Sequence, residues 1–276
     1  MAARGRSEHH VRVRTAFAQS RARVRFDWGL TGALALAEQP GIAAVVVDVL
    51  SFSTAVSVAC DAGVEAFPFR WRDNRASGFA SAHGAQLAAG RRDGGLSLSP
   101  ASIRAWAGGR SQPGGRDSSP SADRLVLPSP NGSSICFALG ERGGPVLAGC
   151  LRNAAAVAGW LARELASDRL PAIGVVAAGE QWPDGGLRPA VEDLWGAGAV
   201  LARLRVLLPG TVFAPEAAAA VAAFEAAEPE LGRLLETCAS GIELIEDGFA
   251  EDVAIAAEFD ASATAPVLTA GRFRAG

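Results

Sequence analysis

A carboxylate and a group of hydroxyls stand at the end of the most apolar segment of the chain. Residues 42–47 are all apolar, Asp48 follows them, and Ser53 and Thr54 come just before a helical pattern over 55–60. Such a continuous apolar run is typical of a strand buried on both faces of a parallel sheet. Hydroxyls and free amides at a helix start bind anions, and a buried carboxylate beside an anion suggests a metal between them. The alternative is that Asp48 only caps the next helix.

Three further junctions between a predicted strand and a predicted helix carry polar side chains with no evident folding role. If the strands are parallel neighbours, these junctions meet at one edge of the sheet, where α/β proteins bind their ligands. Asp48, Glu192 and Asp193 would supply the hard oxygen ligands that Mg²⁺ prefers, and the hydroxyls and amides would bind an oxyanion. Each junction alone is more commonly a cap, but the four together favour phosphoryl transfer. The polar residues at the three junctions are Ser129, Asn131, Gly132 and Ser133; Arg152 and Asn153; and Glu180, Glu192 and Asp193.

Other chemistries fit the sequence less well. Cys136 and Arg142 have the spacing of a cysteine phosphatase, but the residues between them are bulky and helix-like instead of small and loop-forming. A haloacid-dehalogenase site needs a second aspartate two residues after Asp48, where Leu50 stands. The four cysteines lie far apart with no C-x-x-C pair, so we expect reduced, buried thiols. The chain has no lysine, which excludes Schiff-base chemistry and a Walker phosphate loop.

Strand and helix patterns alternate along most of the chain. This alternation predicts a three-layer α/β/α fold with a largely parallel or mixed central sheet. A mostly helical stretch follows from 215 to 259. The predicted strands lie at 11–15, 22–26, 42–47, 64–69, 124–127, 145–149, 172–178 and 265–268, and the earlier helices at 28–38, 52–62, 75–90, 100–106, 135–139, 154–166 and from 190 onward.

Length and composition indicate one globular domain. With 276 residues and a 49% hydrophobic fraction, we expect a single α/β phosphatase-like domain over 1–276, with a flexible arm at 1–10 and a flexible loop at 108–122. The net charge of −3 and the lack of a basic binding motif argue against a nucleic-acid partner. No apolar stretch reaches about 18 residues and the start lacks a signal-peptide core, so we expect no membrane partner and a cytoplasmic location. The sequence leaves open whether the chain forms a homo-oligomer.

An ordered set of short motifs resembles the 2-phosphosulfolactate phosphatase family over about residues 42–270. The resemblance implies an α/β enzyme that depends on magnesium and hydrolyses 2-phospho-3-sulfolactate to 3-sulfolactate and phosphate, in the route to coenzyme M. By position, the resemblance implies that the residues of the family's site are here Asp48, Asn131, Gly132, Ser133, Glu192 and Asp193. The motifs in order are Val46 to Leu50 with Ser53 and Thr54, Ser99-Pro100, Pro130 to Ser133, Asn153-Ala154, Ala178-Gly179, Glu192-Asp193, Ala197-Gly198, Asp252, Asp260 and Pro266.

The residue pattern and the resemblance together give the predicted site. Asp48, Glu192 and Asp193 would be catalytic and would ligate Mg²⁺, with Asp48 either holding metal or attacking phosphorus. The partner would be a small phosphorylated acid, in the family a sulfonated one. The predicted substrate-binding residues are Ser53, Thr54, Ser99, Asn131, Gly132, Ser133 and Asn153.

The chain departs from the family pattern at Ser51, where the family usually has arginine. This change removes a bidentate partner for phosphate or sulfonate. Two alternatives therefore stay open: a non-catalytic relative that binds an anion, and a phosphatase of another small phosphorylated acid.

Overall fold

The computed structural model describes residues 16–70, 74–110 and 123–276. The predicted arm at 1–10, the predicted strand at 11–15 and residues 111–122 of the predicted loop lie outside these ranges. Residues 108–110 of that loop instead end helix α4 (Pro100–Arg110), which continues past Trp106. Ile103 and Ala107 lie one turn apart on α4, and both are buried.

The described residues form one nine-stranded sheet and one small hairpin. Within the sheet, β1, β7, β2 and β6 are parallel to one another, and so are β3, β5 and β4. The antiparallel hairpin β10–β11 joins the two sets through the pairs Val267 with Leu147 and Phe273 with Ala66. The strand order is β1 (Val24–Trp28), β7 (Ile173–Ala177), β2 (Ala43–Val47), β6 (Val146–Gly149), β10 (Pro266–Thr269), β11 (Arg272–Ala275), β3 (Glu65–Phe69), β5 (Arg124–Pro128) and β4 (Gln86–Leu87).

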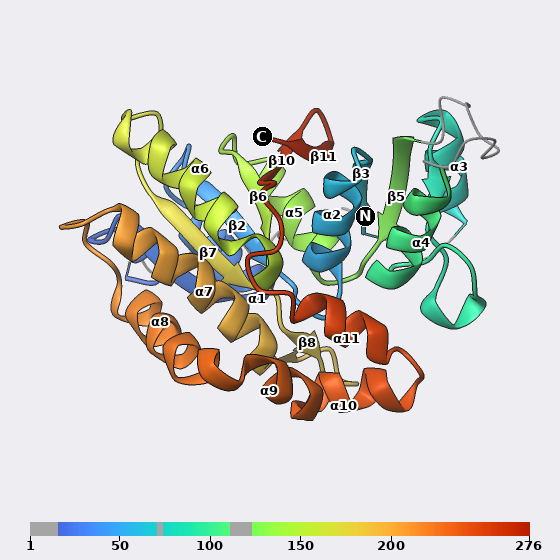
Figure 1. Ribbon diagram of the computed structural model, residues 1–276. Helices are drawn as coiled ribbons and strands as arrows, with labels where there is room; N and C mark the ends of the chain where they lie inside the picture. Colours follow the sequence, from blue (N-terminus) through green and yellow to red (C-terminus); the bar gives the residue numbers. More distant parts are fainter. Residues whose placement is uncertain (1–15, 71–73, 111–122) are drawn as a thin grey trace, which may run out of the picture.

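Helices cover both faces of this sheet, so the predicted three-layer α/β/α fold is confirmed. Helices α6 (Ala154–Ala166), α7 (Val191–Leu207) and α8 (Pro215–Ala227) pack on one face, and α1 (Gly29–Leu36), α2 (Phe52–Asp61) and α5 (Gly132–Gly140) pack on the other (Figure 1).

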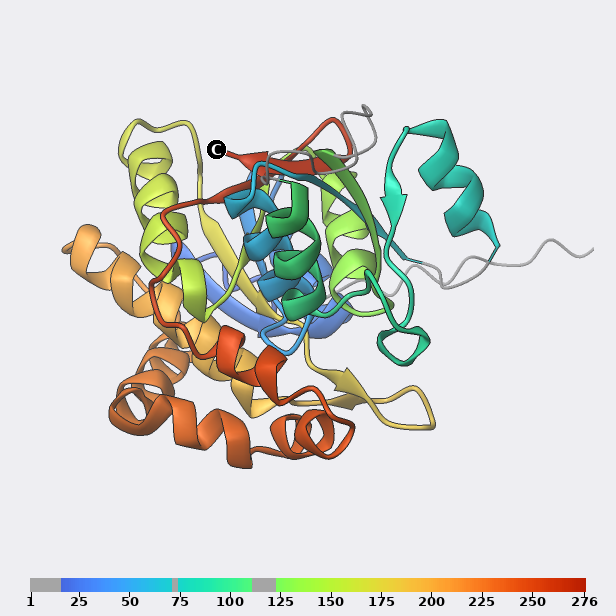
Figure 2. The ribbon, with the colours of Figure 1, turned by 45° about the vertical axis from the view of Figure 1, so that its right-hand side comes forward.

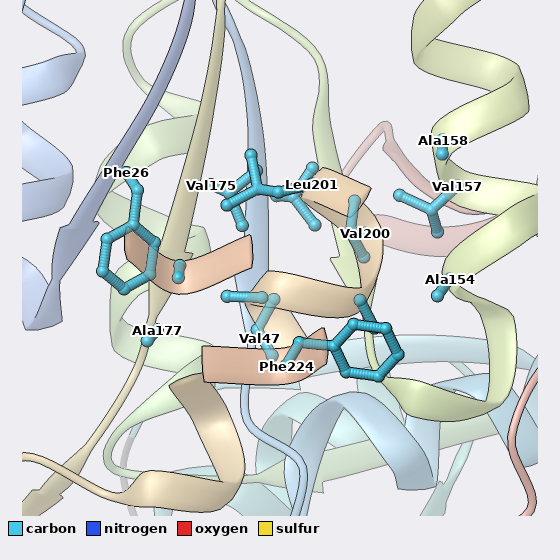
Figure 3. Close-up of a cluster of buried hydrophobic side chains, with 14 of the residues drawn as sticks. Phe26, Val47, Ala154, Val157, Ala158, Val175, Ala177, Val200, Leu201 and Phe224 are labelled. Atoms are coloured by element: carbon cyan, nitrogen blue, oxygen red, sulfur yellow. The ribbon is translucent and has the colours of Figure 1, made fainter. Parts of the chain in front are cut away.

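Strand β2 shows why its sequence is wholly apolar. Val45 and Val47 belong to the hydrophobic cluster under α6, α7 and α8, whereas Val46 belongs to the cluster under α1, α2 and α5. Figure 3 shows Val47 gathered with side chains of β7 and α7, including Val175 and Val200. A central strand buried on both faces needs an apolar residue at every position.

The structure corrects one predicted helix and adds strands that the sequence did not predict. The helix predicted over 75–90 ends at Ala82 (α3, Arg75–Ala82), because Gly84 takes a left-handed conformation with φ of +55°, and β4 follows. The segment after β7 contains the hairpin strands β8 (Glu180–Gln181) and β9 (Leu187–Arg188). The last residues form β11, whose only fully buried side chain is Phe273.

The helical C-terminal part closes one side of the molecule at the end of the sheet. Figure 2 shows these helices close to the β8–β9 hairpin, which extends from the same end. Residues from this region and from the short turn η1 (Arg91–Asp93) approach the strand ends described next. The helices are α9 (Leu231–Thr237), α10 (Ala239–Glu246) and α11 (Ala250–Ala256).

Candidate active site

A cleft of about 540 Å³ lies where β2, β5 and β7 end. Asp48 follows β2, Asn131 follows β5, and Glu180 follows β7, and all three side chains line this cleft. The sequence predicted that strand-to-helix junctions converge, and these three do. The condition that the strands be parallel neighbours does not hold for β5, which is separated from β6 by β10, β11 and β3.

Asp48 is fixed by the start of α2. Its Oδ1 accepts hydrogen bonds from the backbone amides of Ser51 at 2.7 Å and Phe52 at 3.0 Å. Burial raises the pKa of Asp48, and these amides, the Arg91 charge and the Gly132 amide partly oppose the rise. The carboxylate therefore caps α2, as the alternative interpretation of the sequence had it, and at the same time faces the cleft.

The turn Pro130-Asn131-Gly132 brings the start of α5 beside Asp48. Helix α5 packs against α1 and β2, which carries its first turn across to the β2 end despite the distant position of β5. A Cβ on Gly132 would lie 2.5 Å from Phe52 Cδ1 and 2.8 Å from Asp48 Oδ2. Only glycine fits there, so residue 132 makes room for the Asp48 carboxylate.

Glu180 is a cleft residue whose pKa lies near neutrality. Its Oε2 accepts a hydrogen bond from Asn131 Nδ2 at 2.9 Å. The pKa of Glu180 is raised to about 7, mainly by burial and also by the charges of Asp48 and Glu192, while Arg188 and the hydrogen bond from Asn131 act to lower it. A carboxyl group with a pKa near neutrality is suited to general acid–base catalysis. Glu180 was among the junction residues in the sequence but not in the predicted catalytic set, because its burial could not be foreseen.

Three arginines bring positive charge to the cleft. Arg91 forms an ion pair with Asp252 at 3.2 Å, Arg92 with Asp247 at 2.7 Å, and Arg188 donates to Ser240 Oγ at 3.0 Å. They come from η1 and β9, segments in which the sequence showed no anion-binding motif. Ser51, the residue that replaces the family arginine, also lines the cleft. Arg152, the arginine at one of the four predicted junctions, does not line the cleft and pairs with Asp61 and Glu258.

Asp193 holds two loops together. Its Oδ1 accepts from the Val49 amide at 2.7 Å and its Oδ2 from the Gly179 amide at 2.9 Å, so it ties the segment after β2 to the segment after β7. Burial and the charges of Asp48 and Glu192 raise the pKa of Asp193 well above its ordinary value. Asp193 is 3% exposed and does not line the cleft, which makes it a positioning residue.

Glu192 is also withdrawn from the cleft. It is 2% exposed and lies beside the Cys238 thiol, whose pKa is raised to about 11 mainly by burial and also by this carboxylate. Within the described ranges, no group of three or more Asp, Glu, His or Cys side chains is arranged to hold a metal ion. The structure thus does not bring Asp48, Glu192 and Asp193 together as the predicted ligand set.

Five of the predicted substrate-binding side chains point into the protein, where they bind backbone or a buried carboxylate. Ser53 Oγ bonds to the backbone of Asp48, and Thr54 Oγ1 donates to Val49 O at 2.8 Å. Ser99 Oγ donates to Asp252 Oδ1 at 2.6 Å. None of these five lines the cleft, and they support the loops that form it. The remaining two side chains are Ser133, whose Oγ donates to Leu127 O, and Asn153, which bonds to the backbone of Ala148 and Cys150.

The cysteine-phosphatase reading is excluded by the position of Cys136. This residue is fully buried within α5, and burial raises the pKa of its thiol well above the ordinary value. A nucleophilic cysteine needs an accessible thiolate.

The cleft does contain a donor for a magnesium ion. Mg²⁺ is commonly held by one or two carboxylates, with water and substrate phosphate oxygens completing its octahedron. Asp48 fits this pattern because it is a hard oxygen donor that lines a cleft large enough for water and a phosphate group. Three arginines line the same cleft.

The family comparison agrees with the resemblance seen in the sequence. A family model described as 2-phosphosulpholactate phosphatase matches residues 32–271, most of the chain. A search of curated proteins finds no match. None of the helices in the described ranges combines the length and apolar character that a membrane-spanning helix requires.

Proposed function

This chain belongs to the 2-phosphosulpholactate phosphatase family, and on that premise we propose that it hydrolyses the phosphate monoester of a small acid. The first candidate substrate is 2-phospho-3-sulfolactate, with coenzyme M biosynthesis as the pathway. The observation that carries the proposal is Glu180, a proton donor and acceptor near neutrality in a cleft that also holds Asp48 and three arginines.

The three arginines would bind the phosphoryl group. Arg188 reaches the cleft from β9, and Arg91 and Arg92 reach it from η1. Phosphoryl transfer depends mainly on positioning and on neutralising charge on the transferred oxygens. Arginine guanidinium groups perform both tasks.

Glu180 would act as the general acid. Water attacks phosphorus, the bond between phosphorus and the ester oxygen breaks, and Glu180 gives its proton to the departing oxygen. The proton that the attacking water loses then restores the Glu180 acid, so the products are the alcohol and inorganic phosphate. Asn131 holds the Glu180 carboxyl in place through the 2.9 Å hydrogen bond.

Asp48 would hold Mg²⁺ in the cleft. When bound, the ion would neutralise charge on the phosphate oxygens. The amides of Ser51 and Phe52 fix the orientation of the carboxylate, so Asp48 would meet the metal or the phosphate with no change of conformation. Asp193 would keep Asp48 and Glu180 at a fixed separation by tying their loops together.

The test is phosphate release from 2-phosphosulfolactate and from an aryl phosphate, with magnesium and with chelator, for the wild type and for Asp48→Asn. We expect release that requires magnesium and is lost in the variant, and the ratio between substrates measures how strongly the sulfonate is recognised. A folded protein that releases phosphate from neither ester would refute the proposal. Stabilisation by the ester without turnover would then favour the non-catalytic anion-binding alternative.

A further inference from the structure

A second cavity of about 360 Å³ adjoins the cleft. The two cavities share a common wall formed by Pro130, Asn131, Glu180 and Gln181. The wall contains the hydrogen bond between Asn131 and Glu180. A single ligand that extends past these side chains would therefore occupy both cavities.

The two cavities differ sharply in charge. Asp48, Arg91 and Arg188 are among the charged side chains of the cleft. Of the described residues that line the second cavity, Glu180 alone is ionisable, and it belongs to the shared wall. A phosphate group therefore finds arginine partners in the cleft, whereas none of the described residues that line the second cavity is cationic.

Apolar side chains from three different elements line the second cavity, together with the polar side chains of Thr31, Asn131, Ser134, Glu180 and Gln181. Trp28 precedes α1, Ile135 belongs to α5, and Leu187 belongs to β9. Leu187 is 43% exposed, so a ligand in this cavity can reach its side chain. We call this cavity the apolar pocket.

Two glycines allow Leu187 to lie against the backbone of the apolar pocket. A Cβ on Gly179 would stand 2.7 Å from Leu187 Cδ1, and one on Gly29 would stand 3.2 Å from the same atom. Both glycines have positive φ, +66° and +60°, which other residues rarely adopt. The two glycines therefore leave space for the Leu187 side chain against the backbone of the pocket.

We propose that the apolar pocket binds the organic part of the phosphate ester while the cleft binds the phosphoryl group. The substrate class is then phosphate monoesters whose alcohol carries an apolar or aromatic group. The inference rests on the proposed hydrolysis and favours such esters over 2-phospho-3-sulfolactate, whose organic part carries a carboxylate and a sulfonate. Glu180 lies on the shared wall, where the ester oxygen joins the two parts of such a ligand, and this is where a proton donor to the leaving group is needed.

The test compares methyl, n-butyl and n-hexyl phosphate, which differ in apolar length but have nearly the same leaving oxygen. We expect kcat/KM to rise about tenfold or more from methyl to butyl phosphate, as apolar pockets discriminate by added methylene groups. In Leu187→Asn we expect the ratio of butyl to methyl kcat/KM to fall toward one. The matched control is Leu207→Asn, at an exposed leucine of α7 that lines neither cavity, and its ratio should equal that of the wild type.

The outcomes separate this inference from the proposed function. A flat alkyl series in an active enzyme, or an equal loss in Leu187→Asn and Leu207→Asn, would refute the apolar pocket and leave the hydrolase intact. No phosphate release from any ester would refute the hydrolase. In that case calorimetry with methylphosphonate and n-butylphosphonate still tests the pocket, because tighter binding of the butyl compound, lost in Leu187→Asn, needs no turnover.

Discussion

Replacing Glu180 with glutamine removes an ionisable group while keeping the size of the side chain. The new amide oxygen can still accept the hydrogen bond from Asn131 Nδ2. The pKa of Glu180 is raised from 4.5 to about 7 by burial and by the charges of Asp48 and Glu192. The folded protein therefore resists ionisation of this residue more than the unfolded chain does.

The sign of the stability change follows from this shift. A raised folded pKa means that the wild type has its full stability below pH 4.5 and loses part of it as the pH rises through about 7. The difference between about 7 and 4.5 corresponds to about 3 kcal/mol at about 1.4 kcal/mol per pKa unit. Because Glu180 keeps some exposure to solvent, we expect its ionisation to destabilise the wild type by about 2 kcal/mol at pH 8.

Urea unfolding in the presence of chelator measures this effect directly. We expect Glu180→Gln and the wild type to have equal stability near pH 4.5, and the variant to be more stable by about 2 kcal/mol at pH 8. Glu38→Gln is the matched control, since Glu38 is an exposed carboxylate remote from the cleft and should show no such divergence. A variant no more stable than the wild type at pH 8 would refute the assigned burial of the Glu180 charge.

The same variant tests the role of Glu180 in catalysis. As general acid, Glu180 must be protonated, so wild-type kcat/KM should fall as the pH rises above about 7. Glu180→Gln should lose about 100-fold or more with an alkyl phosphate and much less with 4-nitrophenyl phosphate, whose leaving group needs no proton. An equal loss with both esters, or an unchanged pH profile in the variant, would contradict the general-acid assignment.

Three further predictions concern other residues of the cleft. Gly132→Ala should lower stability by about 1–3 kcal/mol and abolish phosphate release, because the new Cβ would meet Phe52 and Asp48. The control Gly140→Ala lies in the same helix and would place its Cβ 3.6 Å from Leu268, so it should change neither property. Thermal unfolding and phosphate release measure both variants. Arg188→Gln should raise KM about tenfold and move the alkaline limb of the pH profile to higher pH, because Arg188 lowers the pKa of Glu180. A limb that moves to lower pH, or the same shift in the control variant Arg163→Gln, would argue against this. Acid quench of a single turnover with ³²P-labelled substrate should leave no label on the protein if water attacks phosphorus directly, whereas ³²P attached to Asp48 would show an aspartyl-phosphate intermediate.

The sequence was sufficient to predict the architecture and one central residue of the site. The unbroken apolar run of β2 required burial on both faces, and the alternation of strands and helices required a layered α/β fold. Asp48 could be predicted because it directly follows that strand, and strand ends in such folds form ligand sites. The turn at Asn131 and Gly132 was found for the same reason.

Only the tertiary structure decided which carboxylates face the cleft and which are buried beside it. Glu180, Glu192 and Asp193 all follow β7, but Asp193 binds two backbone amides, Glu192 lies beside Cys238, and Glu180 alone lines the cleft. The direction of each side chain depends on the β8–β9 hairpin and on the left-handed Gly179, neither of which short-range periodicity reveals. The arginines reach the cleft from η1 and β9 through contacts between distant segments. Local sequence determines strands and helices because it sets apolar periodicity, whereas a site assembled from long-range contacts depends on how those elements pack.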